Sequence, residues 1–302
     1  MSSRAARTGL AQVCLAGVLW GTGGLAVQLI RRHVPMSVLT ISAWRMGIAA
    51  GLLLVVLLAL RQVGGVVLLL RTRPWHAAGV GVATAAYQAL YFGSVVAVGV
   101  TVATVVSLGL APVLLTVGEA AAARRRPAPS ALLVLGLAVG GLVLVSASAG
   151  VSATGPHPTL GLTMAVGSGT AYALTTVLGR RIARLTTPLA LTTTTTTVGA
   201  VALLPFAMLA AGPGTTTDPV AVATLVYLGA MTMALAYGLL YAGLRTTPGS
   251  SAVVATLLEP VTAAVAAAVV LGERLGAAGW VGTALILAAV GGLAVKPAVP
   301  PG

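Results

Sequence analysis

Two charged side chains, Glu259 and Arg45, stand inside long apolar stretches of this sequence. A charge costs roughly 2.5 to 3.5 kcal/mol at the centre of a membrane helix, so such a residue is kept for a function or for a specific partner. Glu259 precedes Pro260, which lacks an N–H and therefore frees a backbone carbonyl one turn earlier. A carboxylate beside free carbonyls can bind a proton, an ammonium group or a sodium ion. The alternative is that protonated Glu259 hydrogen-bonds a neighbouring helix and holds the helices together.

Arg45 offers the complementary chemistry. Its planar guanidinium can hold the carboxylate of an amino-acid-like substrate through two parallel hydrogen bonds. A structural role is the alternative, in which Arg45 extends toward the membrane surface or pairs with backbone carbonyls, as long basic side chains near helix ends commonly do. A third charge, Glu119, lies close to Arg124, Arg125 and Arg126 near the end of an apolar stretch, and this spacing predicts a local ion pair.

Aromatic side chains form two spaced pairs, Tyr87 with Tyr91 and Tyr237 with Tyr241. Residues four apart share one helix face, so each pair can line a cavity with apolar rings and hydrogen-bonding hydroxyl groups. Helix packing uses the same spacing and is the alternative. Trp20 is a further candidate for the cavity wall.

Composition assigns these residues to a membrane protein. Of the 302 residues, 58% are hydrophobic and only 7% are charged, which leaves too little polar surface to cover a water-soluble globule. The net charge of +13 does not indicate a nucleic-acid-binding protein, because the arginines stand singly or in short runs between apolar stretches rather than on a polar face. The one cysteine, Cys14, is expected to be a packing residue.

Ten segments are long and apolar enough to cross a bilayer, which takes about 20 residues per helix. Arg61 to Pro74 is ambiguous between an extension of the second helix and an interfacial stretch. The ten segments are expected at residues 9–30, 37–60, 76–98, 101–121, 130–148, 160–179, 190–211, 220–243, 250–270 and 277–295.

The basic residues predict the orientation of these helices. If both termini are cytoplasmic, thirteen of the seventeen Lys and Arg residues lie on the cytoplasmic side, three lie outside and Arg45 lies within the membrane. Cytoplasmic loops of membrane proteins are enriched in Lys and Arg, so this asymmetry supports both the helix count and the orientation. We therefore expect a multi-pass protein of the plasma (inner) membrane with both termini in the cytoplasm.

Two short motifs recur about 150 residues apart. Ala86–Gly93 matches Ala236–Gly243 at five of eight positions, and the sequence Ala-Val-Gly-Gly-Leu occurs at both 138–142 and 289–293. We expect two five-helix repeats, at 1–148 and 160–302, joined by an extracytoplasmic linker at 149–159. Because five is odd, the second repeat must be inverted relative to the first. Pro112 and Pro260 follow the tyrosine motifs and are expected to be matching hinges or helix breaks.

The run from Tyr237 through Leu275 contains Leu244-Arg245, Leu258-Glu259-Pro260 and Leu-Gly-Glu-Arg-Leu at 271–275. With these motifs it resembles the second half of EamA-type permeases of the drug/metabolite transporter superfamily. The resemblance is most specific at Leu258-Glu259-Pro260 followed thirteen residues later by Gly-Glu-Arg-Leu at 272–275, and Leu19-Trp20-Gly21 and Trp44-Arg45 are similar to the opening of the family's first repeat. It implies ten helices, cytoplasmic termini and export or exchange of small metabolites. The first half departs from the pattern, because the thirteenth residue after Pro112 is Arg125 rather than part of a Gly-Glu-Arg-Leu motif.

These features favour a secondary transporter that exports a small metabolite, such as an amino acid or a related amphipathic compound, by alternating access. The alternative is a membrane protein without transport activity, such as an intramembrane enzyme or a lipid-handling scaffold. No metal-ligand or nucleophile–base spacing occurs in the apolar segments, so we expect neither an enzyme nor a cofactor nor a metal site. Coupling to protons through Glu259 is a hypothesis. The expected surroundings are the lipid bilayer, no nucleic acid, and a monomeric or homodimeric assembly.

Overall fold

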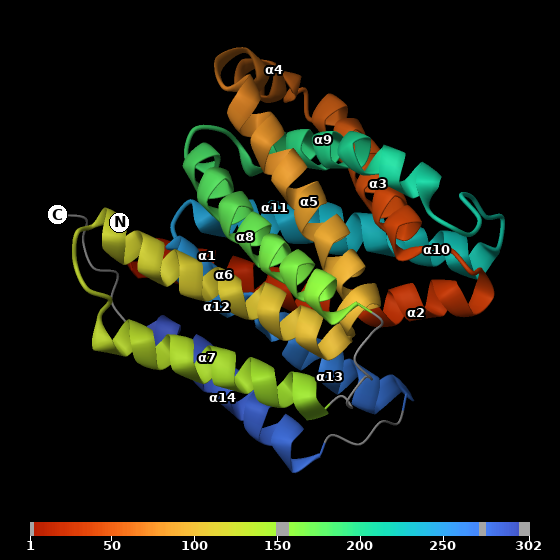
Figure 1. Cartoon of the computed structure of the whole chain (residues 1–302). Coiled ribbons are helices and arrows are strands. Elements are labelled where there is room, and N and C mark those ends of the chain that lie inside the picture. Colours follow the sequence, from red (N-terminus) through yellow and green to blue (C-terminus); the bar gives the residue numbers. More distant parts are fainter. Residues whose placement is uncertain (1–2, 149–156, 272–275, 296–302) are drawn as a thin grey trace.

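The computed structural model describes residues 3–148, 157–271 and 276–295, and within them every regular element is a helix (Figure 1). The helices of the first half are α1 (Ser3–Gly21), α2 (Gly23–His33), α3 (Val38–Ala59), α4 (Val63–Thr72), α5 (Pro74–Val98), α6 (Val100–Ala122) and α7 (Pro129–Ser148). Those of the second half are α8 (Pro158–Ala183), α9 (Pro188–Leu209), α10 (Pro219–Tyr227), the π-helix η1 (Leu228–Leu235), α11 (Ala236–Leu244), α12 (Gly249–Ala255), α13 (Leu258–Leu271) and α14 (Ala277–Val295).

The helices group into ten membrane segments, in agreement with the sequence. Nine of them in the described part of the chain are long and apolar enough to span a bilayer by length and hydropathy. The tenth is α8, which has 26 residues but is less apolar, because it carries Arg180, Arg181 and several threonines. Three segments each contain more than one helix, namely α1 with α2, α10 with η1 and α11, and α12 with α13.

Proline and capping residues set most helix starts. Five helices begin with proline, where its missing N–H costs no hydrogen bond, at Pro74, Pro129, Pro158, Pro188 and Pro219. The side chains of Ser37, Thr187 and Asp218 each accept a hydrogen bond from a backbone N–H in the first turn of α3, α9 and α10. A single residue, Gly99, connects α5 to α6, and its φ of +93° is accessible to glycine but not to most side chains.

The two halves form one bundle rather than two separate ones. Helix α1 packs against α11 and α3 packs against α9, while α5 packs against α8 and α7 packs against α14. The contacts are the same when the two halves are exchanged. The first membrane segment contacts the eighth, and the equivalent pair, the sixth and the third, is also in contact. Likewise the second segment contacts the eighth, and the seventh contacts the third. Helix α1 begins and α14 ends on the same side of the bundle (Figure 1).

Glycines allow the closest helix crossings between the halves. A Cβ atom at Gly141 of α7 would lie 2.7 Å from the carbonyl oxygen of Gly282 in α14, and a Cβ at Gly282 would lie 2.7 Å from the carbonyl oxygen of Gly141. The backbones of α7 and α14 are therefore in direct contact at this point. Membrane helices associate through such small-residue contacts because lipid provides no hydrophobic drive.

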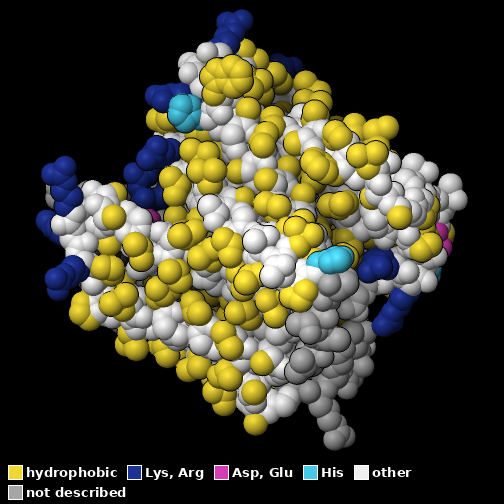
Figure 2. Space-filling model, viewed as in Figure 1, with side chains coloured by type: hydrophobic (Ala, Val, Ile, Leu, Met, Phe, Trp, Pro, Cys, Tyr) yellow, Lys and Arg dark blue, Asp and Glu magenta, His cyan; other side chains and the backbone are white. Residues whose placement is uncertain are grey.

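The outer surface is apolar, as a bilayer requires. In Figure 2, hydrophobic side chains cover the middle of the visible face, whereas Lys and Arg side chains gather toward its margins. Leu209, Met208 and Val269 are among the most exposed large hydrophobic residues. Within the bundle, the threonine run of α9 is satisfied internally, because the hydroxyl groups of Thr192 to Thr196 each donate to a backbone carbonyl four residues earlier.

The ambiguous stretch between the second and third membrane segments is a separate helix. Helix α3 ends at Ala59, Arg61 has a φ of +54°, and α4 then begins at Val63. The stretch is therefore not an extension of the second membrane helix. It packs against α9 and α5 and exposes Leu68 and Leu70.

Candidate functional site

Three of the ten membrane segments are interrupted. The first is broken at Thr22 between α1 and α2, the ninth at Thr256 and Leu257 between α12 and α13, and the eighth contains η1, which widens the helix to π-type turns. Interruptions of this kind free backbone carbonyl groups and are tolerated in membranes only where the protein re-satisfies them. π-Helical turns are frequent at functional sites.

The first interruption contacts the other two. The Nε1–H of Trp20 in α1 donates to the carbonyl oxygen of Thr232 in η1 at 2.8 Å. A Cβ at Gly21 would lie 2.5 Å from the carbonyl oxygen of Glu259, so α1 crosses α13 backbone to backbone beside the break. The sequence predicted none of these positions except the ninth-segment break near Pro260.

The two prolines expected to be matching breaks differ in structure. Pro260 lies in the first turn of α13, directly after the Thr256–Leu257 turn, where the N–H of Glu259 donates to the carbonyl oxygen of Thr256 at 2.9 Å. Pro112 lies inside α6, which continues without interruption from Val100 to Ala122. The expected break at Pro112 is therefore absent. A transmembrane helix can contain proline because neighbouring groups and local adjustments satisfy the freed carbonyl.

The two intramembrane charges come together at these interruptions. Arg45 of α3 and Glu259 of α13 are half-buried and lie close enough for electrostatic attraction, although they form no direct ion pair in the described structure. Arg45 donates through Nη2 to the sulfur of Met233 in η1 at 3.1 Å. Its Nε is buried and has no hydrogen-bond partner among the described residues. An unpaired buried donor on a guanidinium is costly, and an acceptor atom of a ligand could satisfy it.

Aromatic rings lie near the charges in two pairs that have the same centroid distance. Trp20 of α1 packs against Tyr237 of α11 with ring centroids 5.0 Å apart, and Tyr172 of α8 stacks on Tyr87 of α5 at the same 5.0 Å. The four tyrosines Tyr87, Tyr91, Tyr172 and Tyr237 are all within electrostatic range of Glu259. The sequence did not single out Tyr172. Its spacing of 152 residues from Trp20, close to that of the recurring motifs, was the signal that could have identified it.

The second tyrosines of the two pairs, Tyr91 and Tyr241, have different surroundings. Tyr91 is half-buried, and its hydroxyl shares a hydrogen bond of 2.8 Å with that of Thr104 in α6. Tyr241 is fully buried and packs so closely on α8 that a Cβ at Gly179 would lie 2.8 Å from its ring. Of the expected substrate-binding residues, the structure thus brings together Trp20, Arg45, Tyr87, Tyr91, Tyr237 and Glu259, and it places Tyr241 in a packed contact one turn from Tyr237.

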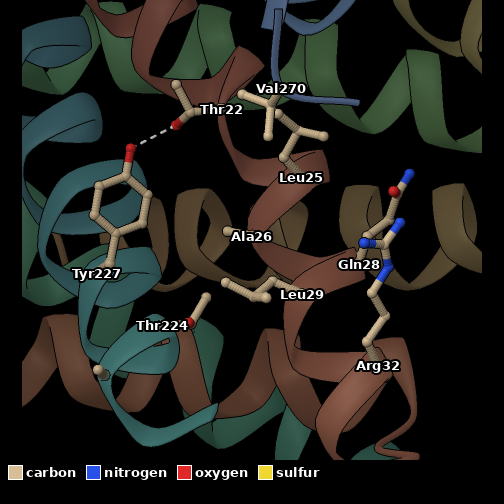
Figure 3. Close-up of a pocket in the computed structure, with 10 residues that line it drawn as sticks. Thr22, Leu25, Ala26, Gln28, Leu29, Arg32, Thr224, Tyr227 and Val270 are labelled. Carbon is tan, nitrogen blue, oxygen red and sulfur yellow. Dashed lines mark hydrogen bonds between the residues drawn. The ribbon is translucent and has the colours of Figure 1, made fainter. Parts of the chain in front are cut away.

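A groove opens beside the first interruption. It lies between α2, α10 and Val270 of α13, has a volume of about 440 Å³ and is mainly apolar. Figure 3 shows Thr22 and Tyr227 joined by a hydrogen bond of 2.7 Å at one end, Leu25 and Leu29 along α2, and Gln28 and Arg32 extending side by side. The groove therefore reaches the level at which α1 contacts η1 and α13.

Comparisons with known proteins identify the family. The sequence profile of the "EamA-like transporter family" matches residues 7–147 and 159–295. This chain belongs to the EamA-like transporter family. The protein is thus a multi-pass membrane transporter, and the family fits the drug/metabolite transporter superfamily.

Two individual relatives match nearly the whole EamA-like chain. The "Uncharacterized transporter YwfM" of Bacillus subtilis (strain 168) is 29% identical over 291 residues, which are 95% of this chain and 93% of that protein. A solved crystal structure is similar over 97% of this chain and 96% of its own, with a TM-score of 0.78 and 20% sequence identity. At that identity the likeness shows the fold alone. Each of the two family matches covers one five-segment half of this transporter.

Glu119 of this EamA-like transporter does not make the local ion pair that the sequence predicted. Its carboxylate accepts hydrogen bonds from the backbone N–H of Gly249 at 2.9 Å and of Ser250 at 3.3 Å, and from the hydroxyl of Ser250. Its cationic partner is Arg180, at 4.0 Å, rather than Arg124, Arg125 or Arg126. Sequence proximity was misleading because α6 ends beside the loop that connects α11 to α12, which is 130 residues away in the chain.

Proposed function

We propose that this protein is a secondary transporter that exports a small amphipathic metabolite of the amino-acid type by alternating access. The observation that carries this proposal is the separation of opposite charges inside the bundle. Arg45 and Glu259 attract each other without pairing directly, and the Arg45 Nε has no partner among the described residues. A molecule with an ammonium and a carboxylate group satisfies both side chains at once.

The aromatic rings support a partly apolar substrate. Trp20, Tyr87, Tyr172 and Tyr237 provide flat apolar surfaces, and an ammonium group beside Glu259 also gains from the faces of the neighbouring rings. Tyr91 extends this wall toward α6, whereas we assign Tyr241 to the support of Tyr237. The site thus combines a few polar groups with apolar walls, as small-molecule sites commonly do.

Alternating access rests on an inverted repeat. The helix contacts persist when the two halves are exchanged, and each half contributes five membrane segments. An odd number of segments requires the second half to enter the membrane in the opposite sense. Two halves of similar structure and opposite orientation can exchange conformations, so that a site between them opens first to one side and then to the other. Pro260 and the adjacent turn supply the hinge in the ninth segment.

The membrane and orientation follow from the distribution of basic residues. We assign the protein to the plasma membrane with cytoplasmic termini, because thirteen of seventeen Lys and Arg residues then face the cytoplasm. In this orientation α2 leads to the outside, and the groove beside Thr22 supports an extracytoplasmic exit route.

Residue Lys296 and the 272–275 motif, with Arg274, lie outside the described residues, as does most of the linker expected at 149–159.

We assign proton coupling to Glu259, which among the described carboxylates lies within electrostatic range of the aromatic rings. The test uses oriented proteoliposomes loaded with a mixture of the protein amino acids, with efflux followed by mass spectrometry. We expect a gradient that is acidic on the outside to accelerate the efflux of at least one amino acid. Glu259→Gln should abolish this acceleration but leave exchange between inside and outside substrate.

The matched control is Asp218→Asn, which changes an acidic residue outside the membrane segments and should leave the response to the gradient intact. Gradient-driven efflux that persists in Glu259→Gln would remove Glu259 from the coupling role. A protein that releases no amino acid under any gradient would refute the proposed substrate class.

A further inference from the structure

The strongest polar contact between the two halves outside the central site is made by Glu119. This residue belongs to α6 of the first half, and all its hydrogen-bond donors belong to the second half. One carboxylate oxygen accepts from the N–H groups of Gly249 and Ser250, and the other accepts from the hydroxyl of Ser250. Arg180 of α8 approaches the same carboxylate and also donates through Nε to the carbonyl oxygen of Thr247 at 3.1 Å. Three membrane segments are joined at this point.

The position of Gly249 shows how tightly this contact is built. A Cβ there would lie 3.1 Å from the nearer Glu119 oxygen and 3.9 Å from the side chain of Leu115, one turn earlier in α6. Leu115 is 4% exposed, so the layer behind the carboxylate is closed. The contact lies near Arg124 to Arg126, at the end of the bundle that we assign to the cytoplasm.

The ninth segment links this contact to the central site. Helix α12 begins at Gly249, which is bonded to Glu119, and ends at Ala255, next to Thr256, whose hydroxyl shares a hydrogen bond of 2.8 Å with that of Tyr172. The break and Glu259 follow directly. Helix α12 packs most against α6 and also contacts α1, α8, α11 and α14, whereas the main neighbours of α13 are α1, α2, α7 and α14. The extensive contact between the fourth and ninth segments is therefore at the Glu119 end.

We propose that Glu119 is a gating residue: it clamps the start of α12 to α6, closes the central site toward the cytoplasm, and is released when that side opens. This inference rests on the proposed transport function. The side chains of Glu119 and Arg180 are 36% and 30% exposed, so water replaces their bonds when the contact opens and no dry charge is left behind. Glu119 is a positioning residue and does not touch the substrate.

Within the described residues, the clamp is found on one side of the bundle. Ala267 of the ninth segment lies as far after Pro260 as Glu119 lies after Pro112. The position that corresponds to Glu119 is therefore an alanine. An inverted repeat with one clamp has unequal end states, and the state that is closed to the cytoplasm is favoured. Loss of the clamp should therefore shift the resting population toward the inward-open state.

The test measures the accessibility of two cysteine reporters without substrate or ion gradients. Cys14→Ala removes the one native cysteine, Leu115→Cys reports on the layer behind the clamp, and Thr104→Cys reports on α6 near Tyr91 toward the outside. Each reporter is labelled with a membrane-impermeant maleimide, from the cytoplasmic side in inside-out vesicles and from the other side in right-side-out vesicles. Because the readout is conformation, failure of the transport assay does not affect it.

We expect Glu119→Gln to raise the labelling rate of Leu115→Cys about tenfold, as expected for the loss of one charge-assisted hydrogen bond. Glu119→Ala removes every bond and should raise the rate by about a hundredfold, while labelling of Thr104→Cys falls at least about twofold. This opposite response distinguishes a gate from a purely structural contact. A smaller variant, Ser250→Ala, should give about a threefold rise and tests the same clamp if a Glu119 variant fails to fold.

Arg125→Gln is the matched control, because it removes a neighbouring charge that lies outside the clamp, and it should leave both rates unchanged. Unchanged labelling of Leu115→Cys in the Glu119 variants would overturn the proposal. So would a rise at both reporters together, which indicates general loosening, and so would an equal effect of Arg125→Gln.

Discussion

The two halves of this transporter place aromatic rings alike but place charges differently. The ring centroids of Trp20 and Tyr237 are 5.0 Å apart, as are those of Tyr172 and Tyr87, although the first pair meets edge to face at 62° and the second is stacked at 27°. Yet the positive charge, Arg45, comes from the first half and the negative charge, Glu259, comes from the second. The residue before Pro112, where the first half would place a carboxylate, is Ala111. A repeated scaffold thus holds a site that is not itself symmetric.

The helix crossings behind these rings show the same division. A Cβ at Gly17 would lie 3.0 Å from the carbonyl oxygen of Thr256, and a Cβ at Gly169 would lie 2.8 Å from that of Ser107. The first crossing meets the ninth segment at its break, and the second meets the uninterrupted α6. Glycine sets the close spacing at both crossings, but the ninth segment is broken at its crossing and α6 is continuous.

Gly21→Ala should have the largest effect on this comparison. The new Cβ would approach the Glu259 carbonyl oxygen to 2.5 Å, and a backbone atom cannot move aside as a flexible side chain can. We expect a loss of about 3 kcal/mol in folding stability, measured as a lower melting temperature in detergent. Gly24→Ala is the control, because nothing lies within 4 Å of its Cβ. Equal melting temperatures of the two variants would refute the proposed contact at the break.

Trp20→Phe should have the next largest effect. It keeps the ring contact with Tyr237 but leaves the Thr232 carbonyl of η1 without its donor, at a cost of about 2 kcal/mol. Tyr172→Phe is the matched change in the other half and loses a hydrogen bond between hydroxyl groups, at a cost of about 1 kcal/mol. Thermal unfolding of both variants measures the difference. A larger loss of stability in Tyr172→Phe than in Trp20→Phe would contradict the greater importance that we assign to the hydrogen bond at the π-helical turn.

Replacing the two prolines should separate scaffold from hinge. Pro112→Ala restores a hydrogen bond in the continuous α6 and should raise stability by about 1 kcal/mol with transport unchanged. Pro260→Ala should favour a continuous ninth helix and lower the transport rate about tenfold without a comparable loss of stability. Flux and melting temperature are measured on the same preparations. Equal transport by the two variants would remove the functional distinction between the prolines.

The smallest effect should come from Asp218, at the start of α10. The hydrogen bond that its carboxylate accepts from the N–H of Ala221, together with nearby His33, holds the pKa of Asp218 below its ordinary value. A carboxylate with a lowered pKa in the folded state stabilises the fold above its unfolded pKa, and this contribution is lost as the pH falls below about 4. Asp218→Asn should therefore slightly flatten the acid side of the curve of melting temperature against pH. An unchanged curve would show that this cap does not contribute to stability.

The sequence predicted the helices well because bilayer thickness limits what an apolar run can do. The ten segments have the expected bounds to within a few residues, except that α1 and α8 extend further. It did not predict the breaks at Thr22 and in η1, since these depend on contacts such as that of Trp20 with Thr232, 212 residues apart. Glu119 was misassigned for the same reason. Tyr172 was missed because its correspondence to Trp20, 152 residues earlier, is recognisable only when the two halves are compared.

The most direct test of the account is a structure of the purified transporter with an exported amino acid bound. We predict ligand density between Arg45 and Glu259. The ligand carboxylate should lie on the guanidinium Nε, which has no partner in the described structure, and an apolar group should lie against Trp20 or Tyr87. Density confined to the groove between α2 and α10, with the space between Arg45 and Glu259 unchanged, would contradict it.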